Sequence, residues 1–353
     1  MKIKIKQIAS FAAAALTVVL LLGAVGIDLP VLGASAARAE VRLLPGGMPF
    51  GVKFSTEGVL VVGFCDVDAE GGSMNPAYAA GLRTHDVITS VNGKQIADAA
   101  QFGTMVADAG ASPLTLTYKR AGESHSATLT PAKSVSENRY KTGLWVRDSG
   151  AGIGTVTFIE PVTGAFGGLG HGICDSESGT LVSMTRGVVN DVTISGVQKG
   201  VSGKPGELKG YFGTTKTGTL LANTDCGVFG IFSQKPITKQ SALPIAHRTE
   251  VKEGEAHILC TLDGTGPCQY TIRITDIDKT ATGSKCFTVK VTDPALIAKT
   301  GGIVQGMSGS PIIQNGKLVG AVTHVLIGDP TTGYGIFIEN MLNAAKQPLQ
   351  NAA

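Results

Sequence analysis

The sequence predicts a mainly β protein with more than one domain, and three features of composition and patterning lead to this prediction. Its 353 residues suffice for about two domains, taking roughly 100 to 200 residues per domain. It contains 48 Gly and 15 Pro, but only 5% of its residues are aromatic. Many short runs rich in Val, Ile and Thr are interrupted by glycine, as is typical of strands joined by tight turns. We therefore expect strands to dominate over long helices.

The first segment, residues 1–39, has the features of an export signal. Three of the first six residues are lysine, and an uncharged apolar run follows from Gln7 to Ile27. Such charge stays on the cytoplasmic side while the run inserts, which places the rest of the chain across the membrane. The run lacks the polar face of a core helix. Ala37-Arg38-Ala39 fits a cleavage site, but the run could also span a bilayer, so a removed signal peptide and a retained anchor both remain open.

Charge and cysteine content limit the partners that we expect. The formal charge is +3, and the lysines and arginines form no block of the kind that follows a phosphate backbone, so a nucleic-acid partner is not expected. Six cysteines in an exported chain could form up to three disulfides, and we expect Cys260 and Cys268 to be a close pair. His171-Gly-Ile-Cys174 lacks the second ligand pair of a structural zinc site, so we expect no metal.

Residues 40–135 are predicted to form a compact module of short strands with helices between them. The apolar run GVLVVGF is typical of a strand, and Asn92-Gly93 is a hairpin signal. The expected elements are a strand at 58–64, a short helix at 77–80 that ends at Gly81, a helix at about 98–107 and a strand at 114–119.

This module resembles a PDZ domain, and the pattern from Ala80 to Gly93 (Ala-Gly-Leu, then Asp-x-Ile, then Val-Asn-Gly) carries the resemblance. The resemblance implies that an extended peptide is captured as an added strand, with its end or an internal turn seated in backbone amides of a loop. By position, that loop contains Pro49, Phe50, Gly51 and Val52. The alternative is that Phe50 and Val52 are core residues of a small β module and that peptide binding is vestigial.

Residues 136–353 are predicted to form the second domain, after a polar connector between Pro131 and Thr142. Glycine-interrupted β-runs recur along this part of the chain, with a spacing that suits a Greek-key barrel or sandwich. A helical segment follows the last of these runs.

The segment from Gly306 to Ala345 contains the clearest chemical signal. Ser308 lies among glycines, ahead of a proline that opens an apolar strand. Glycines allow a tight loop in which backbone N–H groups converge in front of the hydroxyl, as in an oxyanion hole. We therefore predict Ser308 as a nucleophile, with the N–H groups of Gly306 and Ser308 as oxyanion donors.

The same segment resembles the chymotrypsin-like serine peptidases, whose nucleophile lies in Gly-Asp-Ser-Gly-Gly-Pro. Gly306, Ser308, Gly309 and Pro311 match this pattern, whereas Met307 stands in place of Asp and Ser310 in place of Gly. The resemblance implies a double β-barrel with a C-terminal helix. Met307 puts in doubt any activation in which a new N-terminus pairs with an Asp there, and Ser310 is a competing nucleophile.

A serine nucleophile needs a base, and histidine has the pKa for this role at neutral pH. Of the six histidines, His171 lies in a glycine-rich segment 137 residues before Ser308, in the first half of the predicted catalytic domain. His324 follows the nucleophile, in the wrong order for this architecture. A structural histidine in a Gly-rich loop is the alternative for His171. Spacing alone leaves four candidates for the third member of a triad, namely Asp175, Asp191, Asp225 and Asp293.

The whole arrangement is similar to the family of stage IV sporulation protein B. A signal segment and a PDZ-like module precede the segment GHGICD and the segment from Val304 to Val325, over roughly residues 45–345. The resemblance implies a triad of His171, Asp293 and Ser308, with Asp293 lying 15 positions before the serine and Asp225 kept in reserve.

The family resemblance also implies a role in sporulation signalling. The chain would be exported into the space between the two forespore membranes, and would be either secreted or anchored. There it would cleave itself in trans and cleave the extracytoplasmic part of a membrane-bound regulatory complex. That cleavage would activate an intramembrane protease that processes a sigma-factor precursor. The PDZ-like module would recognise another copy or the partner.

This chemistry needs protein or peptide substrates and no cofactor. The main alternative is a non-catalytic PDZ scaffold with an inactive protease-like barrel. A solute- or wall-binding exported protein is a third option, and it would not react with a serine-directed probe.

Overall fold

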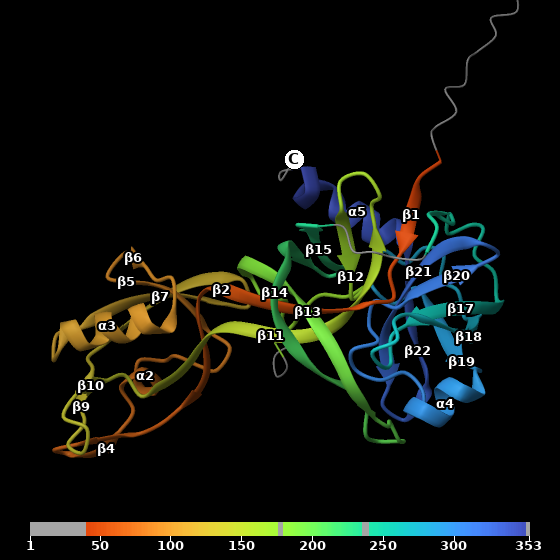
Figure 1. The fold of residues 1–353 in the computed structure, drawn as a ribbon. Coiled ribbons are helices and arrows are strands. Elements are labelled where there is room, and N and C mark those ends of the chain that lie inside the picture. Colours follow the sequence, from red (N-terminus) through yellow and green to blue (C-terminus); the bar gives the residue numbers. More distant parts are fainter. Residues whose placement is uncertain (1–39, 176–178, 235–239, 351–353) are drawn as a thin grey trace, which may run out of the picture. The chain divides into compact units, whose positions relative to one another are not determined.

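The structure is a computed structural model that describes residues 40–175, 179–234 and 240–350 (Figure 1). The predicted export signal at 1–39 lies outside the described residues and stays a prediction. Across the three described ranges, no helix is both long and apolar enough to cross a membrane. Strands make up most of these ranges, so the predicted mainly β class is confirmed.

The first barrel closes because β2 (Pro49–Phe64) pairs on one side with β11 (Leu144–Ile159) and on the other with β13 (Met184–Gln198). From β11 the antiparallel ring continues through β12 (Ala165–Gly168), β15 (Gly227–Phe232) and β14 (Glu207–Thr224) back to β13. Phenylalanines fill the interior, with the rings of Phe50 and Phe166 in an edge-to-face contact at 5.7 Å. Two short strands extend the sheet beside β11, namely β1 (Arg42–Pro45) and β16 (Leu243–Pro244).

The second barrel is also closed and antiparallel. Its strands, in order around the ring, are β17 (Gly254–Cys260), β18 (Cys268–Thr275), β19 (Phe287–Val291), β22 (Asp329–Phe337), β21 (Lys317–Leu326) and β20 (Pro311–Gln314). Helix α4 (Pro294–Thr300) lies between β19 and the segment with Ser308, and α5 (Ile338–Gln350) follows β22. The predicted double barrel with a C-terminal helix is therefore the fold of this part of the chain.

The PDZ-like part lies between β2 and β11 in the chain. Its elements are β3 (Val67–Ala69), β4 (Gly72–Met74), α2 (Pro76–Ala79), β5 (Val87–Val91), β6 (Lys94–Gln95), α3 (Ala99–Ala109), β7 (Leu114–Arg120), β8 (Glu123–Leu129), β9 (Ala132–Lys133) and β10 (Tyr140–Lys141). Side chains from α3 and the strands, such as Phe102, Ile88 and Leu116, form its own core. The expected helices correspond to α2 and α3. The Asn92-Gly93 hairpin joins β5 to β6, with φ of 51° at Asn92 and 77° at Gly93.

Strands β2 and β11 both continue from the first barrel into the PDZ-like part (Figure 1). Residues 49–55 of β2 pair with 149–155 of β11 in the barrel, and residues 60–64 pair with 144–147 in the PDZ-like part. The PDZ-like part is thus inserted into the first barrel rather than placed ahead of it. The strand register shows that β2 and β11 each belong to both parts. The domain boundaries at 40–135 and 136–353 stay a prediction.

The cysteines are all free thiols in the structure. Cys260 and Cys268 are direct cross-strand partners on β17 and β18, as their proposed proximity requires. Burial raises the pKa of the Cys260 thiol to about 12, which disfavours the reactive thiolate.

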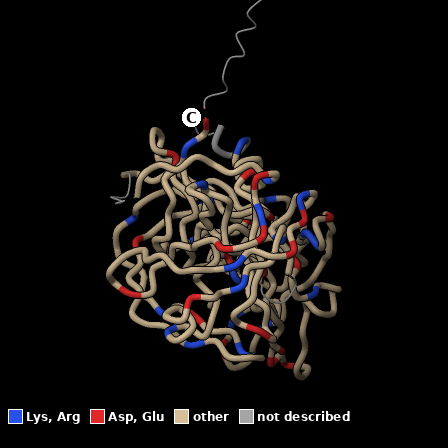
Figure 2. The backbone as a smooth tube through the Cα atoms, turned by 90° about the vertical axis from the view of Figure 1, so that its right-hand side faces the viewer, with Lys and Arg blue, Asp and Glu red and all other residues tan. Residues whose placement is uncertain are grey.

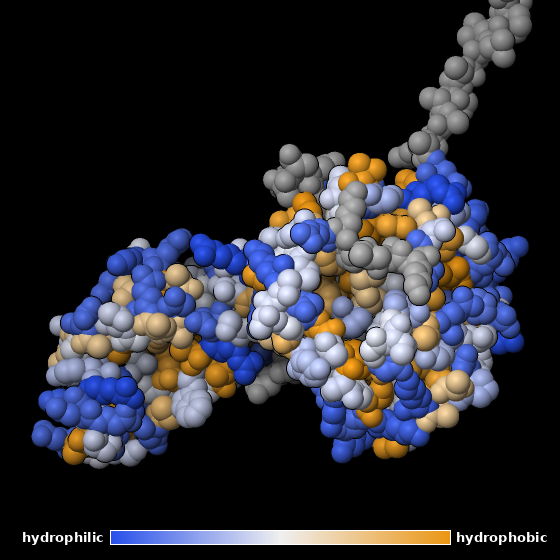
Figure 3. All heavy atoms as spheres, viewed as in Figure 1, coloured by the Kyte–Doolittle hydropathy of each residue, from blue (hydrophilic) through white to orange (hydrophobic). Residues whose placement is uncertain are grey.

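Surface charge is mixed rather than segregated. Figure 2 shows Lys and Arg interspersed with Asp and Glu on the face that it presents. Figure 3 shows apolar side chains reaching the surface in both the PDZ-like part and the barrels. Exposed apolar residues of these parts include Trp145 and Tyr211.

Candidate active site

The segment that carries Ser308 is a tight loop before β20, and it is anchored to the opposite barrel. Gly306 and Gly309 have φ of 94° and 96°, a region that favours glycine. The buried hydroxyls of Thr155 and Thr157 on β11 donate to the carbonyls of Gly306 (2.7 Å) and Gly309 (2.8 Å). The Thr155 N–H donates to the Ser308 carbonyl at 3.0 Å. The loop is therefore fixed from the first barrel as well as from its own.

Two backbone donors of this loop remain available beside the Ser308 side chain. The N–H of Met307 donates to the Val304 carbonyl oxygen at 3.1 Å, and the N–H of Gly309 donates to the Val322 carbonyl oxygen at 2.8 Å. Among the described residues, the N–H groups of Gly306 and Ser308 donate to no protein acceptor. An oxyanion hole requires two such uncommitted donors, so the predicted roles of Gly306 and Ser308 are compatible with the backbone.

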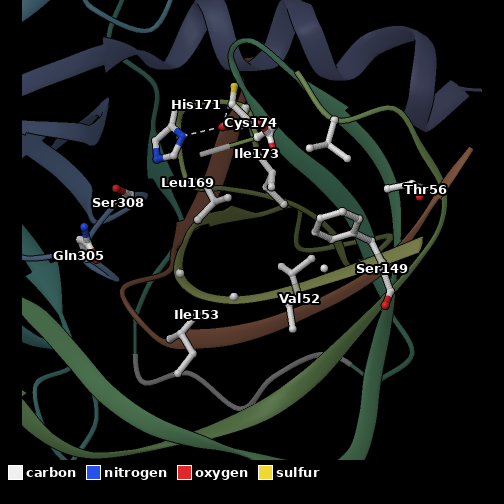
Figure 4. A pocket seen from close by; sticks show the side chains of 18 of the residues that line it. Val52, Thr56, Ser149, Ile153, Leu169, His171, Ile173, Cys174, Gln305 and Ser308 are labelled. Carbon is white, nitrogen blue, oxygen red and sulfur yellow. Dashed lines mark hydrogen bonds between the residues drawn. The ribbon is translucent and has the colours of Figure 1, made fainter. Parts of the chain in front are cut away.

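His171 follows β12 and lines a cavity that Ser308 also lines (Figure 4). Its Nδ1 lies 2.8 Å from the Gly172 carbonyl oxygen. Because a carbonyl only accepts, Nδ1 carries the proton in this contact and Nε2 of the neutral ring is left as the base. Burial lowers the pKa of His171 below its ordinary value, against the opposing effect of the Gly172 hydrogen bond. The imidazole is therefore neutral at pH 7, as a general base must be.

The Ser308 hydroxyl has a different partner in this structure. It donates to the Thr323 carbonyl oxygen at 2.7 Å. Activation by His171 therefore requires the hydroxyl to rotate out of this hydrogen bond and donate to Nε2. Ser310, the competing nucleophile, is fully buried, which removes it from contact with a substrate.

His324 is brought to the site although sequence order had set it aside. Its ring centroid lies 4.8 Å from that of His171. Burial, together with repulsion from His171 and Lys285, lowers the pKa of His324 to about 4, so it adds no charge beside the base at neutral pH. It lies on β21, whose residues Val322 and Thr323 contact the loop that carries Ser308, and no local sequence pattern indicates its contact with His171.

Asp293 lies away from the cavity that Ser308 and His171 share. It is the N-cap of α4, where its carboxylate accepts from the N–H groups of Ala295 (2.9 Å) and Leu296 (3.1 Å), and also from Thr271 (3.2 Å). The structure does not bring it to His171, and its role as the third member stays a prediction.

Asp225 lies closer than Asp293 to the segment that follows His171, here called the histidine segment. It is exposed in the turn between β14 and β15, and its charge contributes to raising the pKa of Cys174, after the larger effect of burial. A Cβ on Gly172 would be 2.9 Å from the carbonyl oxygen of Thr224, so this turn touches the segment after His171. Of the two other candidates, Asp175 lines the cavity but lies 3.3 Å from His85, and Asp191, outside the cavity lining, accepts from the Thr215 N–H at 3.2 Å.

Asn223 is a site residue that sequence reasoning missed. Its side chain accepts from the N–H of Ile173 at 2.7 Å and donates to the carbonyls of Ile173 (2.8 Å) and Val182 (2.9 Å). It thereby holds the segment that follows His171. No local pattern distinguishes such an asparagine from a turn residue.

Pro49, Phe50, Gly51 and Val52 are not in a loop of the PDZ-like part. They lie within β2, paired with 152–155 of β11, and Gly51 and Val52 also pair with β13. Phe50 and Val52 are buried in the first barrel. Gly51 and Val52 are paired on both sides and so offer no free edge for a peptide strand, and the peptide-binding role of the four residues stays a prediction.

The described residues offer no group of three or more His, Cys, Asp or Glu that could hold a metal ion. The cavity at the site has a volume of about 540 Å³. Its arrangement of a hydroxyl, a neutral imidazole and two free N–H groups suits acyl transfer.

Comparison with known proteins gives one family match. The model of a family described as SpoIVB peptidase S55 matches residues 138–342. No curated protein matches the chain.

Solved structures match at low identity. The Rv3671c protease from M. tuberculosis in its active form is 17% identical, over 56% of this chain and 74% of that one, with a TM-score of 0.34. The HtrA-type protease AlgW with a tripeptide is 13% identical, over 57% of each chain, with a TM-score of 0.34. The PDZ domain of an SdrC-like protein from Listeria monocytogenes is 16% identical, over 26% of this chain and 87% of that one, with a TM-score of 0.21.

Proposed function

The chain belongs to the SpoIVB peptidase S55 family and is a serine peptidase, and we propose that it is an endopeptidase in which Ser308 is the nucleophile and His171 the base. One observation carries the assignment of these residues. Ser308 and His171 come from different barrels and line the same cavity, beside the uncommitted N–H groups of Gly306 and Ser308. Protein or peptide chains are the substrates.

The proposed reaction proceeds through an acyl-enzyme. The Ser308 hydroxyl leaves the Thr323 carbonyl and passes its proton to Nε2 of His171 while its oxygen attacks the substrate carbonyl. The N–H groups of Gly306 and Ser308 stabilise the resulting oxyanion. His171 then gives the proton to the leaving amine, and water, deprotonated in turn by His171, releases the acyl group.

The third member of the triad is proposed from the family pattern as Asp293. To act there, its carboxylate would have to exchange the α4 N-cap for the Nδ1 of His171. Asp293→Asn tests this well, because asparagine caps helices about as well as aspartate while a triad Asp→Asn change costs about 10⁴-fold in kcat. A larger loss in Asp293→Asn than in Asp225→Asn would support Asp293, and the reverse would move the role to Asp225.

The biological role is proposed from the family and from the N-terminal segment. We propose export across the cytoplasmic membrane into the forespore intermembrane space, with the segment either removed or kept as an anchor. There the peptidase would cleave itself in trans and cleave a membrane-bound regulatory complex of an intramembrane protease, which leads to sigma-factor processing. The PDZ-like part would recognise another copy or the complex.

Self-cleavage gives the direct test. The purified full chain is incubated as wild type, as Ser308→Ala and as Ser126→Ala, and fragments are followed by intact mass. Ser126 is exposed on β8, so its substitution is a matched control. We expect fragments from the wild type and Ser126→Ala but none from folded Ser308→Ala. Continued fragmentation of Ser308→Ala would overturn the assignment, and stable wild type that also fails to react with a fluorophosphonate would favour the non-catalytic scaffold.

A further inference from the structure

The cavity beside Ser308 extends well beyond the space that one reacting carbonyl needs. The second barrel contributes Gln305, Gly306 and Ser308 to its lining. The rest of the lining comes from β2 and β11 and from the segments around His171 and Val182. Figure 4 shows Ser308 and Gln305 at one side of this cavity, with Val52 and Ile153 across it. The first barrel therefore forms most of its wall.

The chemistry of the base decides which half of a substrate this cavity receives. His171 must hand its proton to the leaving amine, so the leaving-group half of the substrate passes the imidazole as it departs from Ser308. The segment that directly follows His171, namely Gly172, Ile173 and Cys174, is part of the cavity lining. The cavity thus lies where the residues after the scissile bond pass.

The lining predicts the side chains that fit. Its larger apolar members come from four segments and include Val52, Phe54, Ile153, Leu169, Ile173 and Val182. At about 540 Å³ the cavity has room for bulky side chains, and apolar walls favour aliphatic or aromatic ones.

Three alternate glycines of β11 line this space. Gly150, Gly152 and Gly154 share one face of the strand and all line the cavity. A Cβ at Gly150 would meet the Phe54 ring at 2.4 Å, and one at Gly154 would meet Leu169 at 2.0 Å, so these two glycines let apolar side chains pack on the strand. A Cβ at Gly152 would have no heavy atom within 4 Å, so this position faces open space.

The far end of the cavity reaches the inserted part of the chain. Leu60 and Arg147 line it there, and they are direct partners in the stretch of β2 and β11 that continues into the PDZ-like part. At the rim, Asp175 lies 3.3 Å from His85 of the PDZ-like part. A peptide that follows the cavity away from Ser308 therefore runs toward the PDZ-like part.

We propose that this cavity, given the proposed peptidase function, selects substrates with a large aliphatic or aromatic residue in the first three positions after the scissile bond, and that it directs the following residues toward Leu60 and Arg147. Specificity thus resides on the leaving-group side, in the barrel that does not carry the nucleophile.

The test uses the full chain and a peptide library made by digesting a bacterial proteome, with both sides of each cut identified by mass spectrometry. The variants are Gly152→Phe, which fills the cavity, and Gly196→Phe on β13 of the same barrel, where a Cβ also has no heavy atom within 4 Å. Thermal melts check that both fold.

We expect Leu, Ile, Val, Met or Phe to be enriched in the three positions after the cut in the wild type and in Gly196→Phe. We expect Gly152→Phe to reduce kcat/KM for such peptides by about tenfold or more and to shift the preference toward Gly, Ala and Ser. Random residues after the cut, or an unchanged preference in folded Gly152→Phe, would overturn the inference. If Gly152→Phe does not fold, the wild-type profile alone decides.

Failure of the proposed function gives a different result from failure of this inference. A chain that is not a peptidase produces no cuts and does not react with a fluorophosphonate. A chain that reacts and cuts, but without the expected residues after the scissile bond, is a peptidase whose specificity lies elsewhere.

Discussion

Ser308 and His171 approach the same cavity from different barrels, and the segments that carry them are held by different contacts. The loop from Gly306 to Ser310, here called the nucleophile loop, is fixed by Thr155 and Thr157, which are 2% and 0% exposed, and by backbone hydrogen bonds to β21. The segment after His171 depends on the half-buried side chain of Asn223 and on backbone contacts with residues 180–182. We therefore expect substitutions near Ser308 to lower the free energy of unfolding, and substitutions near His171 to lower kcat/KM.

Removal of the base should have the largest effect. His171→Ala leaves Ser308 without a proton acceptor, and we expect a loss of about 10³-fold or more in kcat/KM with little change in the free energy of unfolding. The measurement is the initial rate of peptide cleavage, beside urea unfolding. His125→Ala, at an exposed site of the PDZ-like part, is the control. A folded His171→Ala variant that kept more than about a tenth of the activity would exclude His171 as the base.

The nucleophile loop should respond to added bulk through the stability of the fold. Gly309→Ala places a Cβ 2.0 Å from the Thr155 carbonyl oxygen at a φ of 96°, so we expect it to lower the free energy of unfolding by about 3 kcal/mol or more. Gly316→Ala has a similar φ of 74° but no atom within 4 Å of the Cβ, so it should cost only about 1 to 2 kcal/mol. Urea unfolding measures both. Equal costs would show that the contact with β11 does not hold the loop.

The histidine segment should respond in the opposite way. Asn223→Ala removes the three hydrogen bonds around Ile173 and Val182, and we expect kcat/KM to fall by about tenfold to a hundredfold because the base is misplaced. The global midpoint of urea unfolding should move less than for Gly309→Ala. If Asn223→Ala destabilised the fold as much as Gly309→Ala, the contrast between the two segments would be wrong.

The overall fold could be predicted from sequence, and Ser308 could be proposed as the nucleophile, because the signals for both are local. Glycines around Ser308, the Asn92-Gly93 hairpin and the apolar runs each act within a few residues. The contacts that complete the site depend on pairing between distant segments. Thr155 and Thr157 alternate on one buried face of a strand, where they could equally have been ordinary β-formers.

The placement of Pro49 to Val52 shows the same limit. Their sequence suits the loop of a PDZ module, but β2 continues without a break through Phe64, and its pairing with β11 and β13 takes residues 49–52 into the first barrel. Only the register of the three long strands β2, β11 and β13 determines that residues 49–52 lie in the barrel. The contact of His324 with His171 was missed for a related reason, since order along the chain says nothing of which strand lies beside the histidine segment.

The pH dependence should give the smallest effect. The neutral form of His171 is active, so kcat/KM should fall as the pH drops through a pKa below the ordinary value of 6.5, because burial disfavours the imidazolium. The free energy of unfolding should also decrease as the pH falls below 6.5, because the buried imidazole binds a proton less readily than the imidazole of the unfolded chain. A pH profile of kcat/KM measures the value. A midpoint above 6.5 would indicate that a carboxylate pairs with the ring in the active form, which would sharpen the choice between Asp293 and Asp225.

The most direct test of the central claim is to label the full chain with a fluorophosphonate and locate the adduct by peptide mass spectrometry. We expect one adduct, on the peptide that contains Ser308, and we expect its formation to be lost in His171→Ala. An adduct on another residue, or labelling of Ser308 that does not depend on His171, would contradict the proposal that these two residues from opposite barrels form one catalytic site.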